Sequence, residues 1–484
     1  MMPGSAIHVR VAPLACMLAL AVACATNPVT GKRQLALVSE AQEIEMGRQA
    51  AQQVAQTLGF IEDEGLQALV QRVGGRLAAD SERPSLPWEF HVVDDPTPNA
   101  FALPGGFIYV TRGMVTLMTS EAQLASVLGH EIGHVTARHS VSQISQQQLA
   151  QIGLGLGSIF SPAVQQLSSA LGAGLQLLFL RHSRDDERQA DELGFRYIRE
   201  HGYDVQEFGK VFQSLERTSE AAADGGSPVP SWLSTHPAPG ERVETAAARA
   251  ATVGRQPDAT VGRETFLREL DEVMYGENPR NGFFEDQAFY HPDMRFQLRF
   301  PDGWQTQNTP QAVVAVAPQG AAVFQLTLSP AASAAAGLQQ FAAQQGLQVG
   351  NAGRVSVNGL PAATAEFAAQ TEQGVLQGRI AFLEHGGRTY QLVGYTAAQT
   401  YQAAASTFEA IIGSFGPLTD PARLAVQPNR VSIVTARRTE TLADWARDVP
   451  SAIPVDELAI INQLPGPSAT VQAGTLLKRV TPRS

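Results

Sequence analysis

Residues 129–134 of this chain read Gly-His-Glu-Ile-Gly-His, and they constrain the fold more strongly than any other segment. On a helix, side chains four residues apart point the same way, so the imidazoles of His130 and His134 lie about one turn apart. One Zn²⁺ ion requires this placement of two of its ligands. Glu131 is the candidate general base, which would take a proton from a metal-activated water.

The flanking residues predict the helix that this spacing needs. Ser120 can cap its N-terminus together with Gln123, three residues further on. An apolar stripe follows the same helix at Leu124, Leu128, Ile132 and Val135. We therefore expect a helix that buries this stripe and carries both imidazoles.

A second predicted helix, residues 183–194, supplies what the first lacks. Catalytic zinc needs a third protein ligand and an open position for water. Glu187 and Asp191 lie on one face of this helix, four residues apart. Glu187 is the candidate third ligand, and Asp191 can accept a hydrogen bond from a ligand imidazole and fix its tautomer. Alone, the segment would be a charged, solvated helix face, but beside His-Glu-x-x-His we favour metal ligation.

Together the two motifs resemble the M48 family of zinc metallopeptidases, in which a His-Glu-x-x-His helix is followed by Glu-x-x-x-Asp. Here Glu187 lies 53 residues after His134. The resemblance implies a mainly α-helical, zincin-type domain with a small edge sheet over residues 24–275. It also implies one Zn²⁺ per chain, with the ligands His130, His134 and Glu187, the base Glu131, and Asp191 behind the ligands.

Two further segments extend the resemblance. Residues 99–110 match the family's edge strand beside the cleft, which would hold an extended substrate by strand addition through Asn99, Ala100, Phe101 and Ala102. Residues 234–237, Ser-Thr-His-Pro, place His236 where a histidine of periplasmic members can occupy the open zinc position and hold the enzyme inactive. Alternatively, His236 contacts the reacting carbonyl or is a turn residue. Arg242 or His236 is the candidate for stabilising the oxyanion.

The N-terminal residues predict a targeting segment. Residues 11–23 form an apolar stretch too short to span a bilayer, for which about 20 residues are needed, and typical of a secretory signal. Residues 20–24, Leu-Ala-Val-Ala-Cys, resemble the lipobox of bacterial lipoproteins. This implies removal of residues 1–23 and a lipid anchor at Cys24, with Ala25 favouring the periplasmic side of the outer membrane. The alternative is an unlipidated protein cleaved nearby.

Composition excludes several classes of protein. The chain has 484 residues and 44% hydrophobic content, enough for several packed domains. Its net charge of −11 argues against nucleic acid as a partner. Both cysteines, Cys16 and Cys24, precede residue 25, which excludes a disulfide framework and a cysteine nucleophile in the rest of the chain.

One long segment, residues 141–180, has no Asp, Glu, Lys or Arg and could be mistaken for a membrane hairpin. It contains eight glutamines, whose amides would each need a partner in lipid. We therefore predict a lid or a packed helical hairpin beside the active site.

The C-terminal half predicts two smaller domains. Residues 281–416 combine short β-rich runs with two helical stretches, which indicates an α+β accessory domain without catalytic motifs. Residues 429–484 resemble a LysM domain, the βααβ peptidoglycan-binding module, through residues 439–446 (TETLADWA) and Asn462. Thr439 replaces the usual glycine, so peptidoglycan binding and a module for protein contacts both stay open.

These patterns predict a multidomain, zinc-dependent metalloendopeptidase of the bacterial cell envelope. Its expected substrates are unfolded or misassembled envelope proteins. The alternative is an envelope assembly factor or chaperone-like scaffold with latent proteolysis.

Overall fold

The computed structural model describes residues 24–153, 182–223, 232–236, 239–254, 256–371 and 374–482. The chain divides into two compact units: the first contains the residues up to Gly276 together with Asn429–Thr481, and the second contains Glu277–Pro428. The expected targeting segment and much of the predicted lid lie outside the described residues. Among the helices of the described ranges, none has the length and apolarity needed to cross a membrane.

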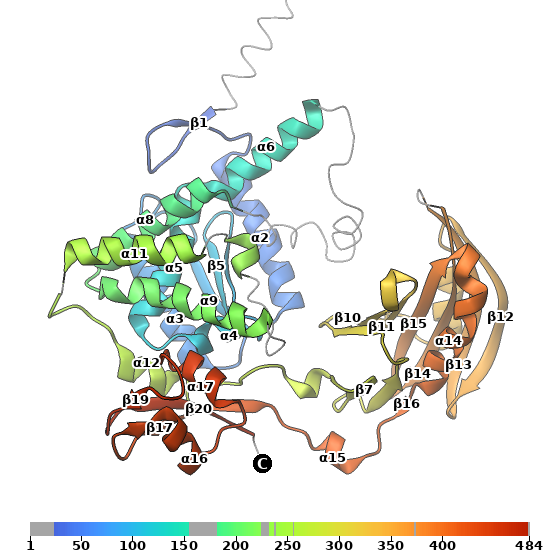
Figure 1. The fold of residues 1–484 in the computed structure, drawn as a ribbon. Coiled ribbons are helices and arrows are strands. Elements are labelled where there is room, and N and C mark those ends of the chain that lie inside the picture. The colour runs from blue at the N-terminus through green and yellow to red at the C-terminus, as the bar shows by residue number, and fades with distance from the viewer. Residues whose placement is uncertain are drawn as a thin grey trace, which may run out of the picture. The chain divides into compact units, whose positions relative to one another are not determined.

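The first unit is mainly helical up to residue 276, which confirms the expected fold class for this region. Its elements are β1 (Cys24–Thr26), β2 (Arg33–Leu35), α2 (Glu40–Thr57), α3 (Glu64–Ala79), β3 (Glu89–Val93), β4 (Ala100–Leu103), β5 (Phe107–Thr111), α4 (Arg112–Leu117), α5 (Glu121–Thr136), α6 (His139–Gly153), α8 (Arg184–Glu200), α9 (Phe208–Ala223), α10 (Trp232–Thr235), α11 (Pro239–Val253) and α12 (Arg263–Glu269). Figure 1 shows α5 enclosed by the other helices of this unit.

Helix α5 forms the centre of the unit, since every residue from Ala122 to Thr136 is buried. Ser120 caps it by accepting a hydrogen bond from the Gln123 backbone N–H, as the sequence predicts. Glycines let α8 approach α5 backbone to backbone: a Cβ on Gly194 would lie 2.8 Å from the backbone nitrogen of His130. A Cβ on Gly133 would lie 3.0 Å from the Ala190 carbonyl oxygen. The two helices that carry the candidate ligands are thus in direct contact.

A three-stranded sheet, in the order β3-β5-β4, packs beside these helices. Strands β3 and β5 are parallel, and β4 pairs with β5 antiparallel in the register Ala100↔Val110 and Ala102↔Ile108. Strand β4 therefore lies at one edge of this sheet.

The C-terminal segment of the first unit contains β17 (Asn429–Thr435), β18 (Glu440–Thr441), α16 (Leu442–Asp448), α17 (Val455–Ile461), β19 (Thr470–Val471) and β20 (Leu476–Pro482). Strands β17 and β20 pair with each other, and β18 pairs with β19. The segment has a small core of its own around Leu442, Trp445 and Leu458. It groups with the helical region in one compact unit.

Specific hydrogen bonds join this segment to the ends of α4 and α5, and Figure 1 shows α17 beside α4. Lys478 is fully buried, and its Nζ donates to the carbonyl oxygens of Thr116 (2.7 Å) and Met118 (2.8 Å). Gln463 Nε2 donates to Gln123 Oε1 at 2.8 Å. Residues from the C-terminal segment thus satisfy carbonyl groups at the C-terminal end of α4 and hydrogen-bond the side chain of Gln123 in the first turn of α5.

The second unit is β-rich, with two antiparallel sheets. The larger sheet has the order β12-β13-β14-β15-β11-β10-β9 and the smaller has the order β16-β8-β7-β6. Their strands are β6 (Phe283–Glu285), β7 (Ala288–His291), β8 (Phe296–Arg299), β9 (Gln305–Asn308), β10 (Ala312–Val316), β11 (Val323–Ser329), β12 (Leu347–Val357), β13 (Leu360–Thr371), β14 (Gly374–His385), β15 (Arg388–Ala397) and β16 (Gly416–Pro417). Helices α13 (Ala334–Ala342) and α14 (Tyr401–Ser414) correspond to the two helical stretches that the sequence predicts.

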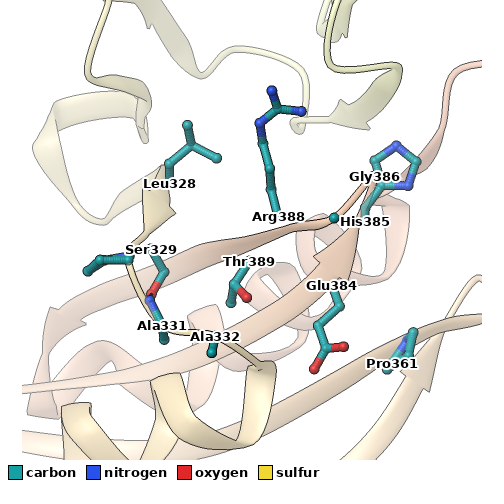
Figure 2. A pocket seen from close by; sticks show the side chains of 12 residues that line it. Leu328, Ser329, Ala331, Ala332, Pro361, Glu384, His385, Gly386, Arg388 and Thr389 are labelled. Carbon is teal, nitrogen blue, oxygen red and sulfur yellow. The ribbon is translucent and has the colours of Figure 1, made fainter.

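A cavity of about 580 Å³ opens in the second unit beside the turn that joins β14 to β15. Figure 2 shows Arg388 and Glu384 among the side chains around it. His385 also lines it, but its Nε2 lies 2.9 Å from the Arg295 carbonyl oxygen. We assign no chemistry to this cavity.

The buried lysine provides a test of how the C-terminal segment is docked. Lys478→Met leaves two buried carbonyl groups without their donor, so we expect a loss of about 1–3 kcal/mol in the free energy of unfolding, measured in urea. Lys32→Met, at an exposed lysine of the same unit, should change this value by no more than about 0.5 kcal/mol. Equal stability of the two variants would contradict the docking.

Candidate metal centre

Helices α5 and α8 bring together the residues that the sequence singles out. His130, Glu131 and His134 come from α5, and Glu187 and Asp191 come from α8; each is less than a tenth exposed. His236 follows α10, Arg242 lies on α11, and both are equally buried. The structure thus places all seven side chains in one cluster, at the contact between the two helices.

Nitrogen and oxygen atoms of four side chains in this cluster have the spacing of a tetrahedral metal site. His134 Nε2 lies 3.0 Å from His130 Nε2 and 3.4 Å from Glu187 Oε1, and His130 Nε2 lies 3.6 Å from Glu187 Oε2. His236 Nδ1 lies 3.3 Å from His130 Nε2 and 2.9 Å from Glu187 Oε1. Tetrahedral zinc with bonds of about 2.0–2.1 Å needs ligand atoms roughly 3.3 Å apart. His130, His134, Glu187 and His236 therefore fit one ion.

Charge balance supports the same fit. Glu131, Glu187 and Asp191 bring three carboxylates, and Arg242 brings one guanidinium. With neutral imidazoles, as metal ligation requires, the buried cluster carries 1 − 3 = −2. A divalent cation compensates that charge.

Asp191 lies behind His130, as the sequence predicts. Its Oδ1 is 2.9 Å from His130 Nδ1, so His130 keeps its proton on Nδ1 and turns the Nε2 lone pair toward the other ligand atoms. Glu131 points to the same space: its Oε1 is 3.7 Å from His236 Nε2 and receives no hydrogen bond from any described residue. A buried acceptor in this position is suited to a water at the metal.

Arg242 holds the carboxylates of α8. Its Nε and Nη2 donate to Asp191 at 2.8 and 2.6 Å, and its Nη1 pairs with Glu187 Oε2 at 2.9 Å. Its guanidinium also lies over the rings of Phe212 (4.2 Å) and Trp232 (4.4 Å). Arg242 is thus placed to position Glu187 and Asp191, and its Nη2 also lies 3.2 Å from His130 Nδ1.

The buried groups shift one another's pKa values. Burial alone would raise the pKa of Glu187, but the imidazoles of His236 and His134 hold it well below its usual range. Burial would likewise raise the pKa of Asp191, which Arg242 and His130 lower instead. Burial and the neighbouring His182 lower the pKa of His134 well below its usual value, which favours the neutral imidazole that a metal binds.

Two further histidines, His139 and His182, belong to this cluster but were missed by the sequence analysis. His139 Nδ1 lies 2.9 Å from His134 Nδ1, and the His182 ring lies on the His134 ring at 3.9 Å between centroids. His139 occurs five residues after His134, which is not a same-face spacing on a helix. In the sequence, only their positions could have indicated a role in the site. His139 follows directly after the His-Glu-x-x-His motif, and His182 directly precedes the capping Ser183.

The edge strand presents backbone groups rather than side chains. The Thr111 N–H donates to the Asn99 carbonyl (2.9 Å), which makes this a hydrogen-bonded pair of the antiparallel ladder. Hydrogen-bonded and non-hydrogen-bonded pairs alternate along an antiparallel ladder. Counting from Asn99, Ala100 and Ala102 therefore turn their N–H and C=O groups away from β5. Phe101 is buried against Tyr109, and Ala102 is half-buried.

Two imidazoles and a carboxylate from two packed helices, with a glutamate beside them, are the ligand set of a zincin-type metallopeptidase. Residues 64–250 match the family described as Peptidase family M48. Residues 291–345 match a family described as NPCBM-associated, NEW3 domain of alpha-galactosidase. The first match, together with the buried ligand set, makes the helical region similar to the metallopeptidases of the M48 family.

Curated relatives agree with this class. The chain is 30% identical to the beta-barrel assembly-enhancing protease of Yersinia pestis over 258 residues, which cover 51% of this chain and 52% of that protein. Identity to the mitochondrial metalloendopeptidase OMA1 of Schizosaccharomyces pombe is 34%, over 40% of this chain and 55% of that protein. The Escherichia coli K12 beta-barrel assembly-enhancing protease is 28% identical, with coverages of 46% and 47%. The chain thus spans about half the length of these relatives.

The contact between Asp191 and His130 predicts a measurable effect on metal binding. Asp191→Asn should weaken zinc binding by about 10–100-fold, because the ligand imidazole loses its anionic acceptor. Chelator competition measures this affinity. Asp185→Asn on the same helix is the matched control, since the Asp185 side chain is 90% exposed, and should bind zinc as the wild type does. Wild-type affinity in Asp191→Asn would contradict the proposed orientation of His130.

Proposed function

We propose that this protein is a zinc-dependent metalloendopeptidase that hydrolyses peptide bonds in unfolded or misassembled proteins of the bacterial cell envelope. The observation that carries the proposal is the convergence of the His130, His134 and Glu187 ligand atoms at 3.0–3.6 Å, with the Glu131 carboxylate beside them. A zinc ion in such a site acidifies a water and polarises a peptide carbonyl.

The side chains of this chain supply the remaining steps. Glu131 takes a proton from the attacking water and returns it to the leaving amine, which its free Oε1 allows. Asp191 and Arg242 hold His130 and Glu187 in place during this transfer. Asn99 and strand β4 accept an extended substrate alongside the free edge, through the outward backbone groups of Ala100 and Ala102.

His236 is the proposed regulator of this site. Its Nδ1 lies 3.3 Å from His130 Nε2 and 2.9 Å from Glu187 Oε1, so it would be the fourth ligand of a bound ion and would take the position that a reacting water needs. We propose that the site is closed while His236 ligates the metal and opens when His236 leaves it.

Cleavage of labelled casein by zinc-loaded residues 25–484 tests the activity. We expect cleavage by the wild type, a loss of at least about 10²-fold in Glu131→Gln, which lacks the general base, and faster cleavage by His236→Ala. Glu192→Gln, an exposed carboxylate on α8, is the matched control and should cleave as the wild type does. No cleavage by any of the four proteins would contradict the peptidase and favour a scaffold.

For location, we propose a lipid anchor at Cys24 on the periplasmic side of the outer membrane. The sequence around Cys24 supports it, as described above. Cys24→Ser should abolish palmitate labelling and release the protein from the membrane fraction. Cys16→Ser is the control, because Cys16 would be removed with residues 1–23, and it should change neither measurement. Labelling that persists in Cys24→Ser would contradict the anchor.

For residues 429–481, we propose a role in protein contact within this chain rather than in binding peptidoglycan. The hydrogen bonds of Lys478 and Gln463 with the α4–α5 region support this choice. So does Arg217 of α9, which donates to the Leu464 carbonyl (2.7 Å). Residues 462–464, directly after α17, are thereby engaged with the metallopeptidase region.

A further inference from the structure

The two ligand imidazoles of α5 have different groups behind them. His130 Nδ1 faces a carboxylate, Asp191, at 2.9 Å. His134 Nδ1 faces another imidazole: His139 Nδ1, also at 2.9 Å. His139 is 3% exposed, so water does not take over this contact.

The hydrogen bonds determine the proton positions along this path. His134 Nε2 faces the other ligand atoms, so its lone pair must stay free and the proton must sit on Nδ1. That proton is donated to His139 Nδ1, which must therefore be an acceptor. The His139 proton then lies on Nε2, and Gln189 Oε1 accepts it at 2.9 Å. In this arrangement each imidazole of the path His134–His139–Gln189 carries one proton, and His139 Nε2 also faces Asp186 Oδ1 at 3.5 Å.

The backbone explains how His139 reaches this position. Helix α5 ends at Thr136, and Arg138 adopts a positive φ of 59°, which interrupts the helix before α6 begins at His139. Glu43 and the Val38 carbonyl hold Arg138 in this conformation through hydrogen bonds of 3.0 Å each. Gln189, at the other end of the path, lies on α8 between Glu187 and Asp191.

We propose that His139 is a positioning residue for the metal centre, which fixes the tautomer and ring orientation of His134 and is itself fixed by Gln189. Helix α8 then supports both imidazoles of α5: His130 through Asp191, and His134 through Gln189 and His139. The proposal rests on the zinc site proposed above, and its test separates the two.

The test compares two replacements of His139. In His139→Asn, the amide Oδ1 takes a place near that of the imidazole Nδ1 atom, so this variant retains an acceptor for His134. His139→Leu has similar bulk but no acceptor. By chelator competition, we expect His139→Leu to bind zinc about 10–100-fold more weakly than the wild type and His139→Asn to stay within about threefold of it. Asp185→Asn, at an exposed carboxylate of α8 outside the hydrogen-bonded path, is the control and should bind as the wild type does.

Cobalt absorption spectra provide a second readout, because they report ligand geometry only in the folded, metal-loaded fraction. The visible bands should change in His139→Leu and match the wild type in His139→Asn and Asp185→Asn. Unchanged affinity and spectrum in His139→Leu would overturn the proposal. So would equal losses in His139→Leu and His139→Asn, or a second bound zinc that His139→Leu and His182→Phe both lose. A wild type that binds no zinc would refute the metal site itself.

Discussion

The metal centre depends on the close approach of α5 and α8. A methyl group at Gly194 would meet the His130 backbone nitrogen at 2.8 Å, and one at Gly129 would meet the Gly194 Cα at 3.3 Å. Overpacking such a contact costs about 1–3 kcal/mol, and separating the helices would also pull Glu187 away from the two imidazoles. Metal sites tolerate shifts of only about 0.2 Å in ligand distances, so the glycines matter more for ligand geometry than for stability.

A buried ionic cluster fixes the C-terminal end of α5. Glu43 of α2 is 1% exposed, accepts from Arg83 Nη1 at 2.7 Å and accepts from Arg138 Nε at 3.0 Å. Removing one member of such a cluster leaves a buried charge unpaired, at a cost of about 3–5 kcal/mol. The cluster also holds the positive φ of Arg138, and through it the position of His139. A contact made by α2 thereby extends to the metal ligands.

The sequence alone identified the candidate ligands and their neighbours where two residues lie close together on one helix. The pairs His130–His134 and Glu187–Asp191 are recognisable because four-residue spacing on a helix is the same in any fold. His139 is not recognisable in this way, since five-residue spacing places a side chain beside the motif only when the helix is interrupted, as it is at Arg138. Lys478 resembles a solvated strand lysine in sequence, and its burial depends on carbonyls of a distant helix. Strands β12 and β13 are rich in alanine and glycine, so pairing with their neighbours, rather than β propensity, forms them.

The surrounding structure does not fix the four candidate ligand residues equally strongly. His130, His134 and Glu187 lie on two long helices in backbone contact, and α5 is fixed at its N-terminal end by Gln463 and at its C-terminal end by the ionic cluster. His236 instead follows the four-residue helix α10. Apart from its contacts with Glu187 and His130 in the site, it is held by stacking on Trp232 and by one hydrogen bond from its backbone N–H to the Trp232 carbonyl. Moving His236 breaks no contact between α5 and α8. Among the four candidate ligands, it is therefore the one whose departure would leave the other three in place, as the proposed regulation by His236 requires.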